Sequence, residues 1–237
     1  MRRVGLVVAT CFLAAACGSS DSATPSRTSS PSPIPTPTVS KAAATELMWE
    51  GVRTNDVDKV RTAAQFADLE DRRDHNRTPL IEATKHNRIE VARVLLEAGA
   101  DPDAKDEIDD SAFLYAGAEG FTEILAMTIE HGANPKSLNR FRGTALIPAS
   151  EHAHVEAVRL LIEAGVPVNH VNDLGWTALH EAIVLGNGDA DHVKVVKMLL
   201  EAGADVTIRD KNGVLPRRLA QQRGQTAIVA AIDASVI

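Results

Sequence analysis

Apolar and polar residues alternate at helical spacing from about residue 44 to the end of the chain. In the segment EVARVLLEA, for example, apolar residues recur three and four positions apart, which predicts a short amphipathic helix. A glycine follows such helices at Gly99, Gly132 and Gly165, where it can take the left-handed conformation that side chains disfavour. A Thr or Ser precedes the partner helix and suits its N-cap. The pattern therefore predicts pairs of short helices joined by turns.

These helix pairs repeat every 33 residues. Four unit starts lie at that spacing: Thr78-Pro79-Leu80, Ser111-Ala112-Phe113, Thr144-Ala145-Leu146 and Thr177-Ala178-Leu179. An alanine stands five positions into each unit, at Ala83, Ala116, Ala149 and Ala182. We expect these alanines where neighbouring helices approach closely, because a larger side chain would push the units apart. Segments such as DAKDEIDD connect the units and suit turns. A fixed period of this kind is typical of stacked repeats.

The units resemble the ankyrin repeat, in which a β-turn precedes two antiparallel helices. TPLIEA, GTALIPA and GWTALHEA carry the resemblance, together with later runs of the LLEAGAD type. The resemblance implies an all-α solenoid of about six helix-turn-helix units with β-turn connections, over residues 43–237. The first and last units depart from the pattern, as capping units do. It also implies a non-enzymatic protein–protein interaction module that binds a partner protein through its concave face and inter-repeat turns.

The N-terminus has the features of a targeting signal. Arg2 and Arg3 precede thirteen uncharged residues, Val4 to Ala16, a run shorter than the roughly 20 residues that span a bilayer. The small residues that lead into Cys17 resemble the lipobox of bacterial lipoproteins, whose cysteine receives a lipid. We therefore expect a signal peptide over residues 1–16 and lipid attachment at Cys17. An ordinary cleaved signal peptide, and thus a secreted protein, is the alternative.

Residues 17–42 follow as the lipid-anchor cysteine and a linker rich in Ser, Thr and Pro. Such a segment cannot bury enough apolar surface to fold, and its prolines favour extended backbone, so we expect it to be disordered. A tether has a purpose when one end is fixed, which supports the lipid anchor. The expected location is therefore the extracytoplasmic face of a bacterial cell membrane, to which the N-terminal lipid holds the chain.

Composition narrows the classes of partner. The formal charge is −7, so no basic excess is present to neutralise the phosphates of nucleic acid. Cys11 and Cys17 are the only cysteines, which excludes a disulfide framework in the repeat domain. We expect a monomer that uses no cofactor.

One polar cluster suggests chemistry, in the segment ALHEAIVLGNGDADHVKVV. A metal-dependent hydrolase with a site near His180, Asp189 and His192 is the enzymatic alternative. However, His180 stands at the histidine of the Thr-Pro-Leu-His pattern, which implies that it braces the turn through hydrogen bonds. Glu181 follows it on a helix and points about 100° away. The other histidines indicate no site, because His152 and His154 are two positions apart and would face different ways on a helix.

The same segment contains an irregularity in the period. Gly165 and Gly203 are 38 residues apart, so five extra residues are expected around Asn187 to Asp191, between the two helices of the unit. A calcium loop is excluded, because His192 and Met198 stand where its glycine and its closing glutamate belong. The segment is either a polar loop, with Asp189 or Asp191 at the start of the second helix, or a contact for a partner.

The turns contain the main candidates for partner binding. Large apolar groups in turns are unfavourable unless they are packed or bound, and Arg and aromatic residues are enriched in binding hot spots. The partner-binding candidates are Arg140, Phe141, Arg142, Leu174, Trp176, Asp189 and Asp191. Trp176 has a second explanation, since its ring can pack on the neighbouring unit. A toxin-neutralising (immunity) protein that uses the same face is a further possibility.

Overall fold

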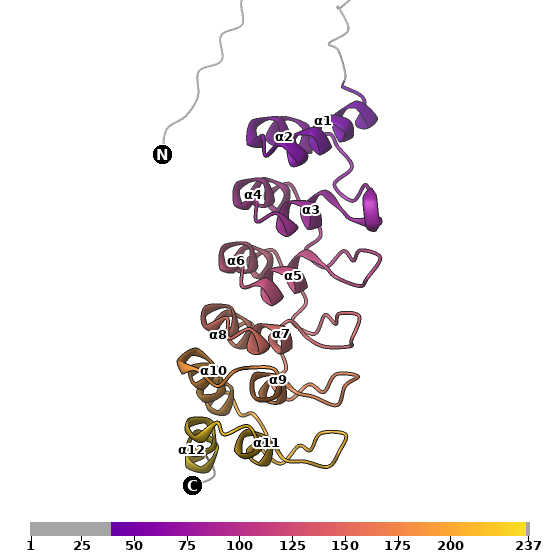
Figure 1. The fold of residues 1–237 in the computed structure, drawn as a ribbon. Coiled ribbons are helices and arrows are strands. Elements are labelled where there is room, and N and C mark those ends of the chain that lie inside the picture. Colours follow the sequence, from indigo (N-terminus) through magenta and orange to yellow (C-terminus); the bar gives the residue numbers. More distant parts are fainter. Residues whose placement is uncertain (1–38, 236–237) are drawn as a thin grey trace, which may run out of the picture. The chain divides into compact units, whose positions relative to one another are not determined.

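Residues 39–235 form twelve short α-helices in a computed structural model of the chain, and these are the residues that the structure describes (Figure 1). The helices form six antiparallel pairs. They are α1 (Lys41–Thr54), α2 (Val57–Ala64), α3 (Pro79–Lys85), α4 (Ile89–Glu97), α5 (Ala112–Glu119), α6 (Thr122–Glu130), α7 (Leu146–Glu151), α8 (Val155–Glu163), α9 (Ala178–Val184), α10 (Ala190–Glu201), α11 (Pro216–Gln222) and α12 (Thr226–Ser235). A 3₁₀ turn, η1 (Asp74–Asn76), precedes α3, and no β-strand occurs among residues 39–235.

The helices of this part of the chain form two layers. The first helices of the units (α1, α3, α5, α7, α9 and α11) contact one another in order along the stack, and so do the second helices (α2, α4, α6, α8, α10 and α12). The turns between units project beyond the first helices, as Figure 1 shows. We call the side lined by the turns and the first helices the concave face. The expected all-α solenoid of six helix-turn-helix units is confirmed.

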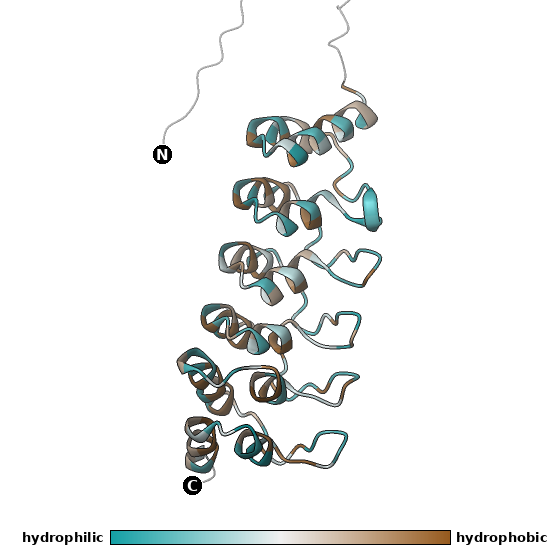
Figure 2. Cartoon of the chain, viewed as in Figure 1, coloured by the Kyte–Doolittle hydropathy of each residue, from teal (hydrophilic) through white to brown (hydrophobic). Residues whose placement is uncertain are grey.

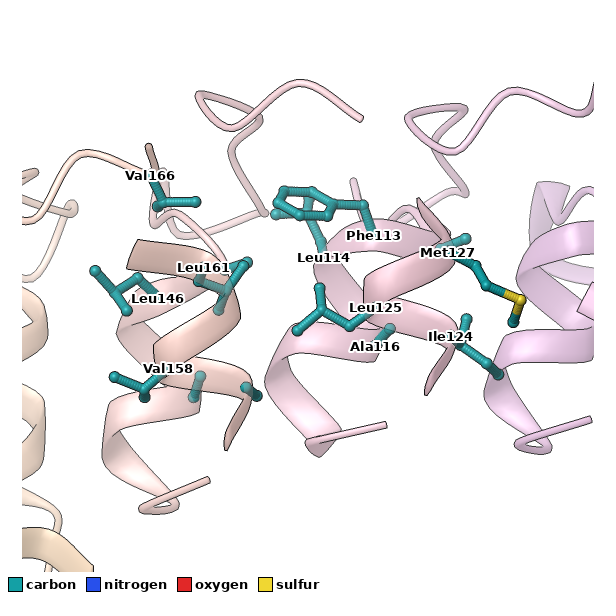
Figure 3. Close-up of a cluster of buried hydrophobic side chains, with 14 of the residues drawn as sticks. Phe113, Leu114, Ala116, Ile124, Leu125, Met127, Leu146, Val158, Leu161 and Val166 are labelled. Carbon is teal, nitrogen blue, oxygen red and sulfur yellow. The ribbon is translucent and has the colours of Figure 1, made fainter. Parts of the chain in front are cut away.

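The repeated apolar positions form a continuous core between the units. Leu80, Phe113, Leu146 and Leu179 are at most 1% exposed, and the four repeated alanines are fully buried. Figure 3 shows side chains of α5 and α6, such as Phe113 and Leu125, next to Leu146 and Leu161 of α7 and α8. Apolar residues concentrate on the helices, whereas the turns are mostly hydrophilic (Figure 2). Each unit therefore completes its core against its neighbours, as stacked repeats require.

The predicted N-caps form at three of the four unit starts. The hydroxyl oxygens of Thr78, Ser111 and Thr177 each accept from the backbone N–H three residues later. Thr144 is the exception. The residue four positions after it is Pro148, which has no N–H to donate to the Thr144 carbonyl. The N–H of Ile147 donates to that carbonyl instead, at 3.2 Å, and so is not available to the Thr144 hydroxyl.

The five extra residues do not all lie in the loop, which corrects the expectation from the sequence. The loop between α9 and α10 has five residues, 185–189, where the preceding unit has three, 152–154. The other three residues lengthen the helix, because α10 has 12 residues and α8 has 9. Asp189 accounts for this division. Its carboxylate accepts from the N–H groups of Asp191 and His192 and so starts the helix at Ala190.

The N-terminal predictions lie mostly outside the described residues. These are the signal peptide over residues 1–16, the lipid on Cys17 and all but the end of the linker over residues 17–42. Helix α1 begins at Lys41, two residues before the expected start of the repeat domain. Among residues 39–235, no helix combines the length and the apolar character that crossing a bilayer requires.

Candidate functional site

A single polar side chain shapes each of the last four turns of the concave face. In one turn, the amide oxygen of Asn139 accepts from the N–H groups of Phe141 and Gly143, both at 2.9 Å. In the next, Asn172 Oδ1 accepts from Leu174 and Trp176 at 3.0 Å. Asp106 and Asp210 make the equivalent bonds in the turns of their own units. Because the side chain fixes the backbone, the residues at the tip of each turn are held in one orientation.

Three successive turns present a large apolar side chain at the same position. Ile108, Phe141 and Leu174 are 33 residues apart and are 41%, 46% and 46% exposed. We call these three side chains the apolar row. The turns are also joined directly, since the N–H of Asp173 donates to the carbonyl of Phe141 at 3.0 Å. The sequence analysis identified Phe141 and Leu174 but missed Ile108, which the 33-residue period would have identified.

A cavity of about 480 Å³ adjoins the apolar row on the concave face. Its walls come from three successive turns and from the first helices α5, α7 and α9, with one residue from the end of α3. They include Ile108, Asp110, Tyr115, Glu119, Arg140, Phe141, Pro148, Glu151, Asn172, Leu174 and Glu181. Of the predicted partner-binding residues, Arg140, Phe141 and Leu174 are brought together here. The cavity is assembled from residues that lie more than 70 positions apart in the chain.

The two basic side chains of the cavity wall have partners within the protein. Arg140 forms an ion pair with Asp110, at 3.4 Å, and its guanidinium lies 4.7 Å from the centre of the Phe141 ring. Lys85 Nζ lies 3.9 Å from the centre of the Tyr115 ring. Burial raises the pKa of the Asp110 carboxyl, and the Arg140 guanidinium opposes that shift. These contacts hold both cations at the side of the cavity.

Glu181 is the most perturbed acid in the cavity. It is 6% exposed, and its carboxylate accepts from the side-chain amide of Asn172 at 2.9 Å. Burial raises the pKa of Glu181 to about 7, and the adjacent carboxyl of Glu151 adds to the shift. Two carboxyl groups from different units therefore meet in a partly dehydrated space. Such a perturbed group in a cleft is typical of a functional site.

The sequence analysis missed the role of Glu181, although its position in the repeat gives a signal. The equivalent residues of the preceding units are Glu82, Tyr115 and Pro148. This position changes chemically from unit to unit, whereas the core leucine and alanine positions on either side of it hardly change. A varying position between constant ones on a first helix indicates a residue that faces the concave face.

The other candidates lie in two different places. Arg142 and Trp176 are in the turns, as expected, but they do not line the cavity. Arg142 is exposed with φ +58°, and Trp176 is half-buried. Asp189 and Asp191 lie at the start of α10, away from the cavity wall. Asp191 forms an ion pair with Lys194 at 2.6 Å.

The structure separates the two histidines of the enzymatic alternative. His180 Nδ1 accepts from the N–H of Thr177 and contacts its hydroxyl, so it braces the turn as predicted. The carboxylate of Asp210, in the following unit, lies near its ring. His192 instead contacts Asp189 and the backbone carbonyl of Glu151, in the preceding unit. In the part of the chain that the structure describes, no three His, Cys, Asp or Glu side chains are grouped to hold a metal ion.

The expectation for His152 and His154 was wrong. These residues do not lie on a helix but in the tight link between α7 and α8, where Ala153 has φ +52°. Because the backbone reverses there, the two rings lie side by side, with their centres 5.6 Å apart. Burial lowers the pKa of His154, and the neighbouring His152 acts in the same direction.

The stacked helix pairs, with a cavity on their concave face, define a class of protein, the helical repeat proteins. Family comparisons then identify the family. A model described as "Ankyrin repeats (3 copies)" matches residues 113–210, and a model described as "Ankyrin repeat" matches residues 75–107. The chain belongs to the ankyrin repeat family, whose repeats are protein–protein interaction modules.

Individual relatives agree with this assignment. The chain is similar to a crystal structure of an ankyrin repeat domain from Acinetobacter baumannii AYE, with 46% identity and a TM-score of 0.77, over 79% of this chain and 96% of that one. It is also similar to the ankyrin repeat protein EF0377, with 37% identity and a TM-score of 0.77, over 80% and 97% of the two chains. The putative ankyrin repeat protein YahD of Escherichia coli K12 is 47% identical over 53 residues, 22% of this chain and 26% of YahD. The chain thus matches only about a quarter of that curated relative's length.

Proposed function

We propose that this protein is a non-enzymatic binding protein that captures a partner protein on its concave face, at the apolar row and the adjoining cavity. The observation that carries the proposal is the apolar row itself. Three large apolar side chains, each more than 40% exposed, stand in line on turns whose backbone is fixed by Asx hydrogen bonds. Exposed large apolar side chains grouped on a rigid support are typical of a protein interaction site.

The chemistry of the surrounding residues supports the same surface. Arg140 and Phe141 are of the residue types that dominate binding hot spots, and they stack on each other at the edge of the cavity. Because this stacking and the turn hydrogen bonds exist before binding, little side-chain entropy is lost when a partner docks. The cavity beside them gives a protruding side chain of the partner a place to enter.

Capture from the native cell tests this proposal. The full chain, crosslinked in its cell of origin, should retain a partner that is lost from the Phe141→Ala and Arg140→Ala variants. Phe66→Ala is the matched control, since Phe66 is 56% exposed but follows the second helix α2 and belongs neither to the apolar row nor to the cavity wall. Equal capture by all variants, or loss only in Phe66→Ala, would contradict the proposal.

We also propose that a lipid on Cys17 holds this binding domain at the extracytoplasmic face of a bacterial membrane. The support comes from the sequence: the basic start, the thirteen uncharged residues, the small residues before Cys17 and the Ser/Thr/Pro-rich linker. A tether of this kind raises the effective concentration of the domain near membrane partners without any further contact.

Mass spectrometry of the purified protein tests the anchor. The expected mature chain begins at Cys17 and carries a lipid, and the Cys17→Ser variant should leave the membrane fraction. An unmodified N-terminus elsewhere, with the protein in the medium, would support the secreted alternative instead. This experiment is independent of partner capture, so either proposal can fail alone.

A further inference from the structure

We infer that the cavity receives a lysine or arginine side chain of the partner, whose charge is held between the carboxyl groups of Glu151 and Glu181. This inference rests on the proposed binding function and adds the chemistry of the residue that the partner must present. It concerns the cavity, whereas the proposed function depends mainly on the apolar row. The two can therefore be tested separately.

The first argument is the unpaired state of the buried acid. Glu181 is 94% buried, as its exposure of 6% shows, and it lines the cavity. The side-chain amide of Asn172 supplies a hydrogen bond but no charge. Within residues 39–235, no basic side chain forms an ion pair with Glu151 or Glu181. A buried carboxylate without a cation is unfavourable, so a cation that enters the cavity gains a strong interaction.

The second argument is that the protein's own cations near the cavity are held elsewhere. Arg140 pairs with Asp110 and stacks on Phe141, and Lys85 lies over the ring of Tyr115. Moving either side chain towards Glu181 would break these contacts. The acidic residues of the cavity wall outnumber its basic residues by four (Asp110, Glu119, Glu151 and Glu181) to two (Lys85 and Arg140). The charge of the cavity therefore complements a cation from outside.

The third argument is the shape and polarity of the walls. The apolar side chains of Phe141, Leu174 and Ile147 line the same space as the acids. Lysine and arginine bury a long apolar stem while their charged end seeks a polar partner. A space of about 480 Å³ with apolar walls and acids at one place matches such a side chain better than it matches a short cation.

Binding of this cation should depend on pH through Glu181. Burial raises the pKa of Glu181 to about 7, so the carboxyl is charged at pH 8 and neutral at pH 5.5. The neighbouring elements contribute few other charges to this point. On the cavity wall they are Glu151 at the end of α7, His152 after it, Glu119 of α5, Asp110 and Arg140 in the turns, and Lys85 at the end of α3. Outside the wall, His192 of α10 contacts Asp189, and Arg217 of α11 pairs with Asp233 at 2.5 Å. A partner cation therefore binds most strongly above pH 7.

Two capped tripeptides, Leu-Lys-Leu and Leu-norleucine-Leu, provide the test, since norleucine is lysine without the ammonium group. The full chain, labelled with ¹³C at the glutamate carboxyl carbons, is titrated with each peptide and followed by NMR. At pH 8 we expect the lysine peptide to bind about tenfold more tightly than the norleucine peptide. At saturation it should lower the pKa of Glu181 by about one unit. At pH 5.5, where Glu181 is neutral, the preference for the lysine peptide should be clearly smaller than at pH 8.

Variants connect the effect to the two acids. In Glu181→Gln and Glu151→Gln the preference for lysine should fall towards one, because a neutral amide replaces the charge without changing the size of the side chain. Glu130→Gln, which changes an exposed acid at the end of α6, is the control and should keep the full preference. Equal binding of both peptides to the unmodified protein, or an unmoved Glu181 signal, would overturn the inference. Loss of partner capture in Phe141→Ala would still support the proposed function in that case.

Discussion

Two polar regions of this protein look alike in composition but differ in how their charges are satisfied. The first is the loop between α9 and α10 with the start of α10, where Asp189, Asp191 and His192 are close in sequence. The second is the cavity of the concave face, where Glu151 and Glu181 come from different units. In the first region the charged groups are paired by hydrogen bonds and ion pairs within the protein. In the second region Glu151 and Glu181 have no cationic partner within residues 39–235.

The loop shows how a dense polar cluster can be purely structural. Asp189 accepts from two backbone N–H groups and from the His192 ring, and this lowers the pKa of Asp189. The other ring nitrogen of His192 contacts the backbone carbonyl of Glu151 at 3.0 Å. From the last unit, the Gln225 amide donates to the carbonyls of Ile183 and Gly186. Since the charged groups of this loop have internal partners, the region has little to offer a charged ligand.

The cavity shows the opposite arrangement. Its acids lie 30 residues apart in the chain, and tertiary packing places them together without a cation. Such a pair lowers the stability of the fold, so its presence is easier to explain by binding than by folding. The contrast indicates that local polar clusters in a repeat protein build the scaffold, whereas clusters formed across units are candidates for function.

The largest expected effect is on the pH dependence of stability, through Glu181. Because its pKa rises from 4.5 to about 7 on folding, the folded state binds the proton more tightly than the unfolded state. The free energy of unfolding should therefore fall by about 3 kcal/mol as the pH rises from 4.5 to 7. Glu181→Gln should remove most of this fall and should be more stable than the unmodified protein at pH 8. Urea titrations between pH 4 and 8 measure the free energy of unfolding at each pH. If it varied with pH in the same way in both proteins, Glu181 would not be the group responsible.

The second effect tests how tightly the α9–α10 loop is packed. A Cβ added at Gly186 would lie 2.2 Å from the carbonyl oxygen of Ala182 and 2.2 Å from the His192 ring. Gly186→Ala should lower the free energy of unfolding by about 2 kcal/mol, because backbone atoms would have to move. Gly203→Ala is the comparison, since its Cβ meets nothing within 4 Å and only the φ of +88° is unfavourable. In urea unfolding, Gly203→Ala should lose less free energy of unfolding than Gly186→Ala. A greater loss in Gly203→Ala than in Gly186→Ala would show that the loop is not tightly packed at Gly186.

The third effect compares the contributions of Asp189 and Asp191 to thermal stability. Asp189→Ala removes the N-cap of α10 and the partner of His192, so the thermal midpoint should fall by about 3 °C. Asp191→Ala loses only an exposed ion pair with Lys194 and should change the midpoint by less than about 1 °C. Calorimetry distinguishes the two variants. Equal shifts would mean that the cap does not stabilise the helix start.

The smallest effect on stability is expected in the apolar row. Phe141 is 46% exposed at a turn tip whose backbone is held by Asn139, so Phe141→Ala should change the free energy of unfolding by less than about 0.5 kcal/mol. The same variant should lose partner capture, in contrast to the Gly186→Ala variant, which is expected to lose stability. A large loss of stability in Phe141→Ala would indicate that the ring serves the fold rather than a partner.

Periodicity predicted most of the fold because each unit depends on local features. Thr78 and Thr177 cap helices, Gly99 ends one at φ +100°, and Ala83 is fully buried, all as the sequence indicated. The failures have local causes as well. Pro148 removed the donor on which the usual arrangement at Thr144 depends, and Asp189 placed most of the extra residues in a helix. Single residues therefore shifted element boundaries without changing the architecture.

The sequence by itself determined the repeat, the helix pairs, the core positions and the turns in which Arg140, Phe141 and Leu174 lie, because these follow from spacing and from short-range hydrogen bonds. Only the tertiary structure showed that the side chains of the apolar row are exposed beside a cavity and that Glu151 and Glu181 meet in its wall. The physical reason is that burial and charge repulsion depend on which units stack together. A carboxyl group that looks solvated in one unit becomes a buried, unpaired acid once its neighbours cover it.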